Sequence, residues 1–264
     1  MTYKLIAVDI DGTLLNDKGE LTEGNIEAIR EAVDKGVIFT IATGRPVQGV
    51  VNFIEALKRD IPFITYNGAM VITGKSREII YERKLNEDDA RIIINWGREH
   101  GSTVMVWKNN NLYVTALDER AERYRNISKV EAIPIKDLDE VVKGGVSKVL
   151  WYNDVDKINE HQKIIGQYIS ENVNYHTSMP YFLEFNDKLA SKAIAMENLG
   201  RHFGIKQNEM IAIGDGYNDL SMIEYAGLGV AMDNAPDEIK QRADFVTLSN
   251  NEDGVAHVIR KFVL

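Results

Sequence analysis

The sequence contains no cysteine. Disulfide bonds, thiolate metal sites and cysteine nucleophiles are therefore excluded, and the absence of disulfides fits a reducing compartment. Histidine is also scarce. The five histidines are scattered along the chain and predict no metal cluster: His100, His161, His176, His202 and His257. Metal ligands and nucleophiles are then expected among the oxygen-bearing side chains.

Long apolar runs and an excess of positive charge are also missing. No stretch approaches the ~18 apolar residues that a membrane span needs, and the apolar run near the N-terminus is short and ends at Asp9. The formal net charge is −9, whereas a nucleic-acid-binding protein normally carries a basic face. We therefore expect a cytoplasmic protein that binds neither nucleic acid nor membrane. The expected oligomeric state is a monomer or a weak homodimer.

The chain does contain alternating short apolar runs and amphipathic segments. Strands are predicted over Lys4–Val8, Val37–Ala42 and Pro62–Thr65. Helices are predicted over Thr22–Lys35 and around Val47–Lys58. This alternation predicts an α/β fold with a Rossmann-like, doubly wound parallel sheet. Ligands of such sheets bind beyond the carboxyl ends of the strands, so polar residues that follow these strands are candidate site residues.

The middle of the chain has a different pattern, with hairpins and frequent aromatic residues. A helix is predicted over Asn86–His100, and hairpins over 103–115 and 174–185. After Asp187 the strand–helix pattern returns. We expect residues 84–185 to form an inserted α+β unit, and residues 1–83 and 186–264 to form the core domain.

Two acids follow the first predicted strand. Asp9 stands at its end, and Asp11 follows two residues later, before Gly12. Close carboxylates repel each other unless a cation lies between them. Mg²⁺ fits such a place because it prefers oxygen ligands. An ordinary turn would also explain these residues, but an EF-hand loop would not, because Leu14 occupies the position of its glycine.

Three further segments carry candidate residues at the same predicted edge. Asp215 and Asp219 follow the predicted strand Met210–Ile213 and could complete a metal site, although Asn218 or Asp219 could equally cap a helix. Lys192 begins a predicted helix, where a phosphate would be stabilised; Lys188 is a rival. A hydroxyl, backbone N–H groups and a guanidinium follow the second strand at Thr43, Gly44 and Arg45.

These segments resemble the four signature motifs of the haloacid dehalogenase-like superfamily. Asp9-Ile-Asp-Gly-Thr-Leu resembles the first motif, Thr43-Gly-Arg the second, Lys192 the third, and Gly214-Asp-Gly-Tyr-Asn-Asp219 the fourth. Tyr66-Asn-Gly-Ala, the large insertion and Gly229-Val-Ala-Met resemble the Cof-type sugar-phosphatase group. One departure is Ala193, where the family usually has a glycine after the lysine.

The resemblance implies a Mg²⁺-dependent phosphatase that hydrolyses small phosphorylated metabolites, with sugar phosphates as the expected class, through an aspartyl-phosphate intermediate on Asp9. Asp9 would be the nucleophile and Asp11 the general acid and base. The metal site would include Asp9, Asp11, Asp215 and Asp219. The phosphate and substrate site would include Ile10, Thr43, Gly44, Arg45, Asn67, Lys192 and Asn218. The inserted unit would be a cap that closes over the site and sets specificity.

Other functions use similar residues. A phosphomutase or phosphotransferase would pass the phosphoryl group from Asp9 to another hydroxyl instead of water. A non-catalytic regulator would bind phosphate through the same fold. A sugar-nucleotide transferase could use Asp9 and Asp11 as a metal motif, but it would leave Lys192 and Asp215 without a role.

Overall fold

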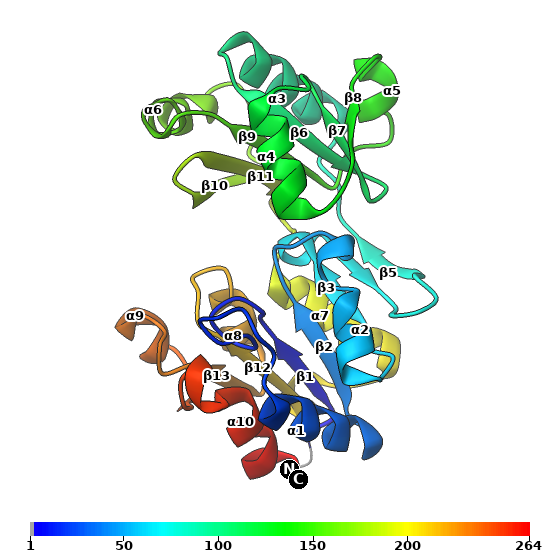
Figure 1. The fold of residues 1–264 in the computed structure, drawn as a ribbon, viewed down its shortest axis with the longest axis vertical. Coiled ribbons are helices and arrows are strands. Elements are labelled where there is room, and N and C mark those ends of the chain that lie inside the picture. The colour runs from blue at the N-terminus through cyan, green and yellow to red at the C-terminus, as the bar shows by residue number, and fades with distance from the viewer. Residues whose placement is uncertain (1–2) are drawn as a thin grey trace. The chain divides into compact units, whose positions relative to one another are not determined.

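A computed structural model describes residues 3–264. The chain forms two compact units, whose elements are labelled in Figure 1. The first unit comprises the chain up to Tyr81 together with Ser191–Leu264, and the second comprises Glu82–Ala190. The second unit is therefore an insertion between two segments of the first.

The first unit is built on an eight-stranded sheet with the order β14-β13-β12-β1-β2-β3-β4-β5. Its strands are β1 (Leu5–Val8), β2 (Ile38–Ala42), β3 (Phe63–Thr65), β4 (Met70–Ile72), β5 (Ile79–Glu82), β12 (Met210–Gly214), β13 (Leu228–Ala231) and β14 (Phe245–Val246). The pairs from β14 to β3 are parallel, and β4 pairs antiparallel with β3. The predicted α/β class with a doubly wound parallel sheet is confirmed.

Strand β1 lies at the point where the strand order reverses. The chain continues from β1 to β2 and β3 on one side, and from β12 to β13 and β14 on the other. Val8 of β1 is in register with Ile213 of β12 and Ile41 of β2. The residues that follow these three strands therefore meet at one edge, where the connections diverge and leave room for a ligand.

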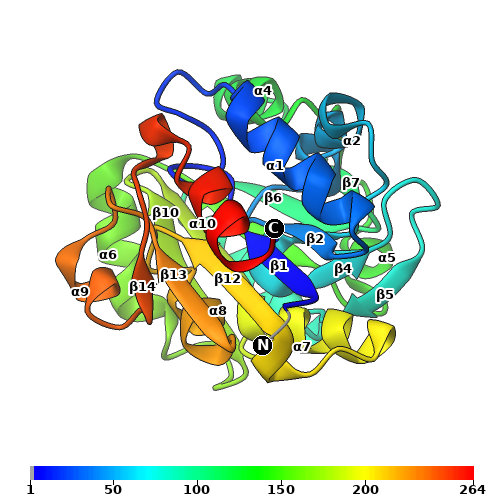
Figure 2. The ribbon, with the colours of Figure 1, turned by 90° about the horizontal axis from the view of Figure 1, so that it is seen from below.

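Helices cover both faces of this sheet, as Figure 2 shows. They are α1 (Glu23–Asp34), α2 (Asn52–Leu57), α7 (Lys192–Phe203), α8 (Leu220–Tyr225), α9 (Asp237–Lys240) and α10 (Gly254–Phe262). On one face, Met196 and Leu199 of α7 pack with Leu5 and Ala7 of β1, and α1 packs against α10 on the other. Coverage of both faces explains why the predicted strands are continuously apolar.

Helix boundaries follow local capping signals. The Thr22 hydroxyl accepts a hydrogen bond from the Asn25 N–H and starts α1, and the Ser191 hydroxyl accepts one from the Ile194 N–H and starts α7. The helix predicted around Val47–Lys58 is present but shorter than expected. A 3₁₀ turn, η1 (Val47–Gly49), precedes the short α2, because a glycine and two β-branched valines interrupt the segment.

The second unit contains a six-stranded sheet with the order β10-β11-β9-β6-β7-β8. Its strands are β6 (Thr103–Lys108), β7 (Asn111–Val114), β8 (Ala132–Pro134), β9 (Lys148–Tyr152), β10 (Val173–Met179) and β11 (Phe182–Asp187). Its helices are α3 (Glu87–Glu99), α4 (Glu119–Ser128), α5 (Leu138–Val142) and α6 (Val155–Ile165). Residues 117–145 carried no predicted element, so α4, β8 and α5 are additions to the expected pattern.

The two faces of the second sheet differ in chemistry. On one face, Val149 and Trp151 pack with Ile93 of α3 and Ile158 of α6 in an apolar core. On the other face, Lys148 is ion-paired with Glu184 of β11 at 2.7 Å, and both side chains are buried. Within residues 3–264, no helix combines the length and the apolar character needed to cross a membrane.

Candidate active site

Asp9 lies at the carboxyl end of β1, the central strand of the first unit. Its backbone N–H donates to the carbonyl of Ile213 on β12 at 3.0 Å, which continues the parallel ladder one residue past the strand. Only 6% of Asp9 is exposed. The sheet thus fixes this carboxylate at the edge where the order of the strands reverses.

Lys192 joins two of the predicted acids. Its ammonium Nζ lies 2.6 Å from Oδ1 of Asp9 and 2.5 Å from Oδ1 of Asp219. The side chain is fully buried although it carries a charge. Lys188, its rival from the sequence, is exposed. A buried lysine between two carboxylates is retained only when its partners are fixed, because an unpaired buried charge is costly.

The third acid, Asp215, follows β12. Carboxylate oxygens of Asp9, Asp215 and Asp219 all lie within 4.8 Å of one another. The Oδ2 atom of Asp219 accepts hydrogen bonds from the N–H groups of Asp215 and Gly216 at 3.1 and 2.9 Å, which fixes the loop between them. Residues separated by more than 200 positions in the sequence therefore form one acidic cluster.

The cluster has more negative charge than its lysine can balance. The cluster holds three carboxylates, and its one ammonium group contacts two of them. Burial raises the pKa of Asp9 to about 7, and the charge of Asp219 adds to the rise while Lys192 opposes it. Burial likewise raises the pKa of Asp215 to about 6, against the hydrogen bond that it accepts from Thr13. A divalent cation among these oxygens would supply the missing positive charge.

Asp11 lies outside this three-carboxylate group. The guanidinium of Arg45 holds both of its oxygens, with Nη2 at 2.5 Å from Oδ1 and Nε at 3.0 Å from Oδ2. This fork geometry is the bidentate pairing that favours arginine over lysine. The sequence led us to expect that Arg45 binds the substrate or its phosphate, whereas in the structure its guanidinium binds Asp11.

Gly12 allows the loop after Asp11 to approach Asp215. Its φ is +84°, and a Cβ atom there would lie only 2.3 Å from Oδ2 of Asp215. The adjacent Thr13 hydroxyl donates to Oδ1 of Asp215 at 2.6 Å, and the Asn234 amide donates to the Gly12 carbonyl at 2.8 Å. Thr13 and Asn234 were not expected from the sequence as site residues, although Thr13 stands within the first motif.

Backbone groups and hydroxyls lie at the same edge of the sheet. Thr43 follows β2 and is 2% exposed. The backbone N–H of Ile10 has no hydrogen-bond acceptor within residues 3–264, so it is available to a ligand. Available donors next to an acid-and-lysine cluster are the groups that a phosphoryl oxygen needs.

Asn67 is presented by an unusual backbone turn after β3. In η2 (Tyr66–Gly68), all three residues have positive φ, 53°, 56° and 94°. A Cβ atom at Gly44 would lie 2.9 Å from the Asn67 side-chain oxygen, so these two residues touch closely. That oxygen also accepts from the Asn218 amide at 3.4 Å. Non-glycine residues with left-handed backbone concentrate at functional sites.

Comparisons with known proteins agree with this arrangement. A family model for haloacid dehalogenase-like hydrolases matches residues 6–259. YxeH of Bacillus subtilis is 37% identical over 268 residues, covering 99% of each chain. YcsE of the same organism, a 5-amino-6-(5-phospho-D-ribitylamino)uracil phosphatase, is 34% identical over 263 residues, covering 99% of this chain and 96% of YcsE.

A solved structure gives the same result for the fold. The sugar phosphatase BT4131, of subclass IIB of the superfamily, superposes with a TM-score of 0.79 at 27% identity, covering 98% of each chain. The chain therefore belongs to the haloacid dehalogenase-like hydrolases, in their Cof-type group. It is a phosphatase, and its chemistry is phosphoryl transfer.

Proposed function

We propose that this phosphatase depends on Mg²⁺ and hydrolyses small phosphorylated metabolites, sugar phosphates among them, through an aspartyl-phosphate intermediate on Asp9. One observation carries the proposal: Asp9, Asp215 and Asp219 converge within 4.8 Å around a buried lysine that contacts two of them. A site of this composition can bind a cation and a phosphoryl group side by side.

The acidic cluster fits Mg²⁺ by its chemistry. Its donors are carboxylate oxygens, and burial together with the charges of Asp219 and Asp215 raises the pKa of Asp9, against the opposing effect of Lys192. Asp9, Asp215 and the backbone carbonyl of Asp11 would hold the ion, with Asp219 in support. The ion would neutralise charge on the phosphoryl oxygens.

Asp9 is the proposed nucleophile. One of its oxygens attacks the phosphorus atom, and the bond from phosphorus to the ester oxygen breaks. The leaving alkoxide takes a proton from Asp11. Asp11 then accepts a proton from water as the water oxygen attacks phosphorus, and the bond from phosphorus to Asp9 breaks. The products are an alcohol, inorganic phosphate and the free enzyme.

Arg45 links substrate binding to the proposed acid. Because both oxygens of Asp11 are bonded to the Arg45 guanidinium, one of them must be released before Asp11 can reach a leaving group. A substrate phosphate competes with Asp11 for the same fork of N–H donors. Arriving substrate would therefore draw Arg45 away and free Asp11 at the moment when it is needed.

The remaining expected residues would hold the phosphate. Lys192 and the Thr43 hydroxyl supply a charge and a hydroxyl donor, and the N–H groups of Ile10 and Gly44 supply backbone donors. Asn218 and Asn67 would complete the set, since their amides already meet at 3.4 Å. Preorganised donors of this kind stabilise the charge that develops during phosphoryl transfer.

The substrate class is inferred from the relatives. BT4131 is a sugar phosphatase and YcsE acts on a phosphorylated ribityl compound, so their substrates carry a phosphate on a polyhydroxylated carbon chain. We propose the same class here, with the unit Glu82–Ala190 as the cap that sets specificity.

A panel of phosphorylated metabolites, assayed for phosphate release with and without Mg²⁺, tests this function. We expect activity that requires Mg²⁺ and falls by at least about 1,000-fold in Asp9→Asn. The matched control is Asp34→Asn, which changes an exposed aspartate paired with Arg59. Activity that survives in Asp9→Asn would overturn the assignment of the nucleophile.

The two remaining alternatives predict different products. A phosphomutase or phosphotransferase would yield a phosphorylated isomer or acceptor instead of free phosphate. A non-catalytic phosphate-binding regulator would bind phosphate esters without turnover of any ester in the panel. Product analysis of the same reactions separates all three.

A further inference from the structure

The loop that follows β1 (the β1 loop, residues 10–17) is anchored from outside by asparagine side chains. Three of its backbone carbonyls each accept a hydrogen bond from the amide of one such asparagine: Gly12 from Asn234 at 2.8 Å, Leu14 from Asn25 at 3.4 Å and Leu15 from Asn250 at 3.0 Å. An asparagine amide carries two N–H donors and one carbonyl acceptor, so a single side chain can join two backbone segments. The loop that carries Asp11 is therefore held at three points by residues outside it.

These three asparagines differ in burial. Asn25 and Asn250 are buried, and so are their hydrogen bonds to the β1 loop. Loss of such an amide would leave a buried acceptor unpaired, which destabilises the fold. Asn234 is exposed, and water could take its place at the Gly12 carbonyl. The hydrogen bond from Asn234 therefore adds little to stability, and what it determines is the direction in which the Gly12 carbonyl points.

The amide of Asn234 is itself fixed at both of its polar atoms. Its Nδ2 donates to the Gly12 carbonyl, and its Oδ1 accepts from the backbone N–H of Asn250 at 3.0 Å. Because one partner is an acceptor and the other a donor, only one orientation of the amide satisfies both. The backbone just before Asn234 is anchored to the sheet, since the Met232 N–H donates to the Gly214 carbonyl of β12 at 3.0 Å. Asn234 therefore presents its donor at a defined place beside the β1 loop.

The Gly12 carbonyl needs such a partner because glycine lets the backbone rotate. Gly12 has a φ of +84°, and without a Cβ atom the peptide group that follows it turns easily. This peptide group leads to Thr13, whose hydroxyl donates to Oδ1 of Asp215 at 2.6 Å. The peptide group before Gly12 carries the carbonyl of Asp11, which we propose as a ligand of Mg²⁺. A rotation at Gly12 would therefore misdirect two groups of the site at once.

We propose that Asn234 is a positioning residue of the metal site. By holding the Gly12 carbonyl, it keeps the carbonyl of Asp11 and the hydroxyl of Thr13 directed toward the cluster of acids. It acts through the backbone of the β1 loop and not as a ligand, in the way that groups behind metal ligands set the orientation of those ligands. The proposal rests on the Mg²⁺-dependent function proposed above and adds to it a residue that the four motifs do not contain.

Mg²⁺ binding measured by isothermal titration calorimetry tests this role without turnover. Asn234→Leu removes both hydrogen bonds of the amide at nearly constant side-chain size. We expect the Kd for Mg²⁺ to rise about 10–100-fold, while the unfolding midpoint in EDTA shifts by no more than about 4 °C. In the phosphatase assay, the Mg²⁺ concentration for half-maximal rate should rise by the same factor, and more Mg²⁺ should recover most of kcat. Asn234→Ala, which adds no apolar surface, should show the same changes.

Asn251→Leu is the matched control within the same loop. Asn251 is also exposed, and its amide also uses both polar atoms, donating to Oδ2 of Asp17 at 2.9 Å and accepting from the Asp17 N–H at 3.1 Å. It anchors the far end of the β1 loop, so Asn251→Leu should leave the Kd for Mg²⁺ unchanged. An equal rise in Kd for Asn234→Leu and Asn251→Leu would overturn the specific role of Asn234, because it would reflect loosening of the whole loop.

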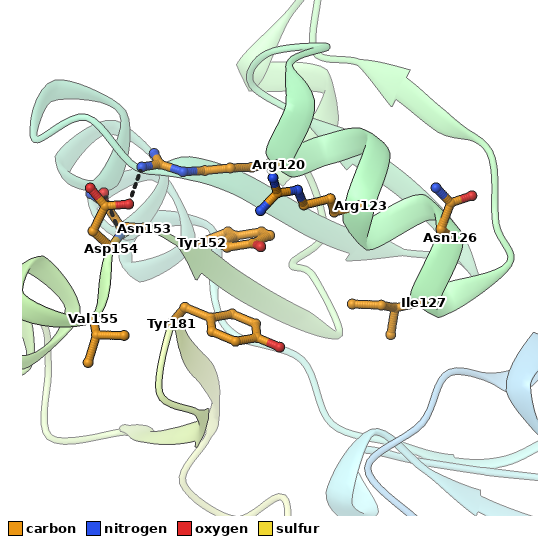
Figure 3. Close-up of a pocket in the computed structure, with 9 residues that line it drawn as sticks. All are labelled: Arg120, Arg123, Asn126, Ile127, Tyr152, Asn153, Asp154, Val155 and Tyr181. Atoms are coloured by element: carbon orange, nitrogen blue, oxygen red, sulfur yellow. Dashed lines mark hydrogen bonds and ion pairs between the residues drawn. The ribbon is translucent and has the colours of Figure 1, made fainter.

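A second control comes from the unit Glu82–Ala190. Gly101 also has a positive φ, 76°, and its carbonyl also accepts from a side chain, the guanidinium of Arg120, at 3.1 Å. Figure 3 shows Arg120 at a pocket of that unit, where it is bonded to Asp154. Among residues 3–264, the group of acids that could hold an ion lies in the first unit. Arg120→Met should therefore leave the Kd for Mg²⁺ unchanged.

Amide hydrogen exchange of the metal-free protein, followed by NMR in EDTA, measures the positioning itself. The Thr13 N–H donates to the Ile10 carbonyl at 3.4 Å within the β1 loop. We expect Asn234→Leu to speed exchange of the Thr13 N–H about tenfold and to leave that of Asp17 unchanged. Asn251→Leu should do the reverse. Unchanged exchange at Thr13 in Asn234→Leu would overturn the proposal.

The results separate this proposal from the function on which it rests. Absence of Mg²⁺ binding by the wild type would refute the metal site, and the role of Asn234 with it. Mg²⁺ binding with an equal Kd in the wild type and in Asn234→Leu would refute the role of Asn234 alone. Phosphate release from no ester, with the predicted Kd values, would count against the proposed substrates and support the role of Asn234.

Discussion

Among residues 3–264, two buried lysines pair with acids, one in each unit, and they differ in charge balance. Lys148 meets one carboxylate, Glu184, at 2.7 Å. Glu184 accepts a further hydrogen bond from the Ser178 hydroxyl at 2.7 Å, so the pair is neutral and satisfied. Lys192 meets two carboxylates, and a third lies within 4.8 Å.

The pKa values record this difference. Burial alone would raise the pKa of Glu184, but the charge of Lys148 and the hydrogen bond from it hold this pKa below its ordinary value. Asp9 also contacts a buried lysine, yet its pKa rises to about 7, through burial and the neighbouring Asp219. A balanced buried pair is a structural element, whereas an unbalanced one needs a further cation and marks a site.

The largest expected difference between the two lysines is in catalysis. Lys192→Met should lower phosphatase kcat by at least about 1,000-fold, because it removes a charge next to the nucleophile and the phosphate. Lys148→Met should keep kcat within about tenfold of the wild type. Steady-state phosphate release from one ester measures both. Similar losses in the two variants would remove the functional distinction between the lysines.

Double substitution should show that apolar residues can replace the Lys148–Glu184 pair with little loss in the free energy of unfolding. Lys148→Met alone leaves Glu184 buried and unpaired, and we expect it to cost about 3–5 kcal/mol. Lys148→Met combined with Glu184→Leu should recover most of that loss, because apolar residues can replace a balanced pair. Urea unfolding followed by circular dichroism measures both free energies. A double variant no more stable than the single one would contradict a balanced, replaceable pair.

Asp9→Asn should stabilise the metal-free protein at pH 8 while it abolishes activity. The pKa of Asp9 is about 7 in the folded protein, against an ordinary value of 3.8. Between these two pH values the folded state therefore binds more protons than the unfolded state. Stability then falls as the pH rises from about 4 to about 7. Removing the charge should recover a free energy on the order of a few kcal/mol, measured by urea unfolding with EDTA present. A destabilised variant at pH 8 would refute this.

The Lys148–Glu184 pair should show the opposite pH dependence, with a smaller effect. Because the pKa of Glu184 is lowered, its contribution is present above the ordinary value of 4.5 and is lost as the pH falls through the folded value. Glu184→Gln should therefore flatten the acid limb of stability below pH 4.5, by about 1 kcal/mol. Thermal unfolding between pH 3 and 6 measures the limb. An unchanged slope would show that Glu184 does not titrate in this range.

Much of the first unit could be predicted from its sequence. Its strands are buried on both faces, so Lys4–Val8 and Met210–Ile213 read as continuous apolar runs, and their polar endings marked Asp9 and Asp215. Helix α7 begins at Lys192 as predicted, because Ser191 caps its start, and Gly204 ends it with a left-handed φ of 68°. Such signals depend only on neighbouring residues, so they can be read directly from the sequence.

Other features depend on contacts that the sequence does not encode locally. Helix α4 escaped prediction because Ala121, Tyr124 and Ser128 are its only buried residues, and charged residues fill half of its length. The pairing of Arg45 with Asp11 could not be predicted, since it joins residues 34 positions apart through loop geometry. The role of Thr13 likewise could not be predicted, because it depends on the 2.6 Å hydrogen bond from its hydroxyl to the distant Asp215.

The central claim is that the unbalanced cluster of Asp9, Asp215 and Asp219 binds a divalent cation. Its most direct test is the thermal unfolding of the wild type, Asp215→Asn and Glu184→Gln during a Mg²⁺ titration at pH 7. The account predicts that saturating Mg²⁺, near 100 times Kd, stabilises the wild type and Glu184→Gln by about 2.7 kcal/mol, and leaves Asp215→Asn unchanged. An equal shift in all three proteins, or none in the wild type, would contradict it.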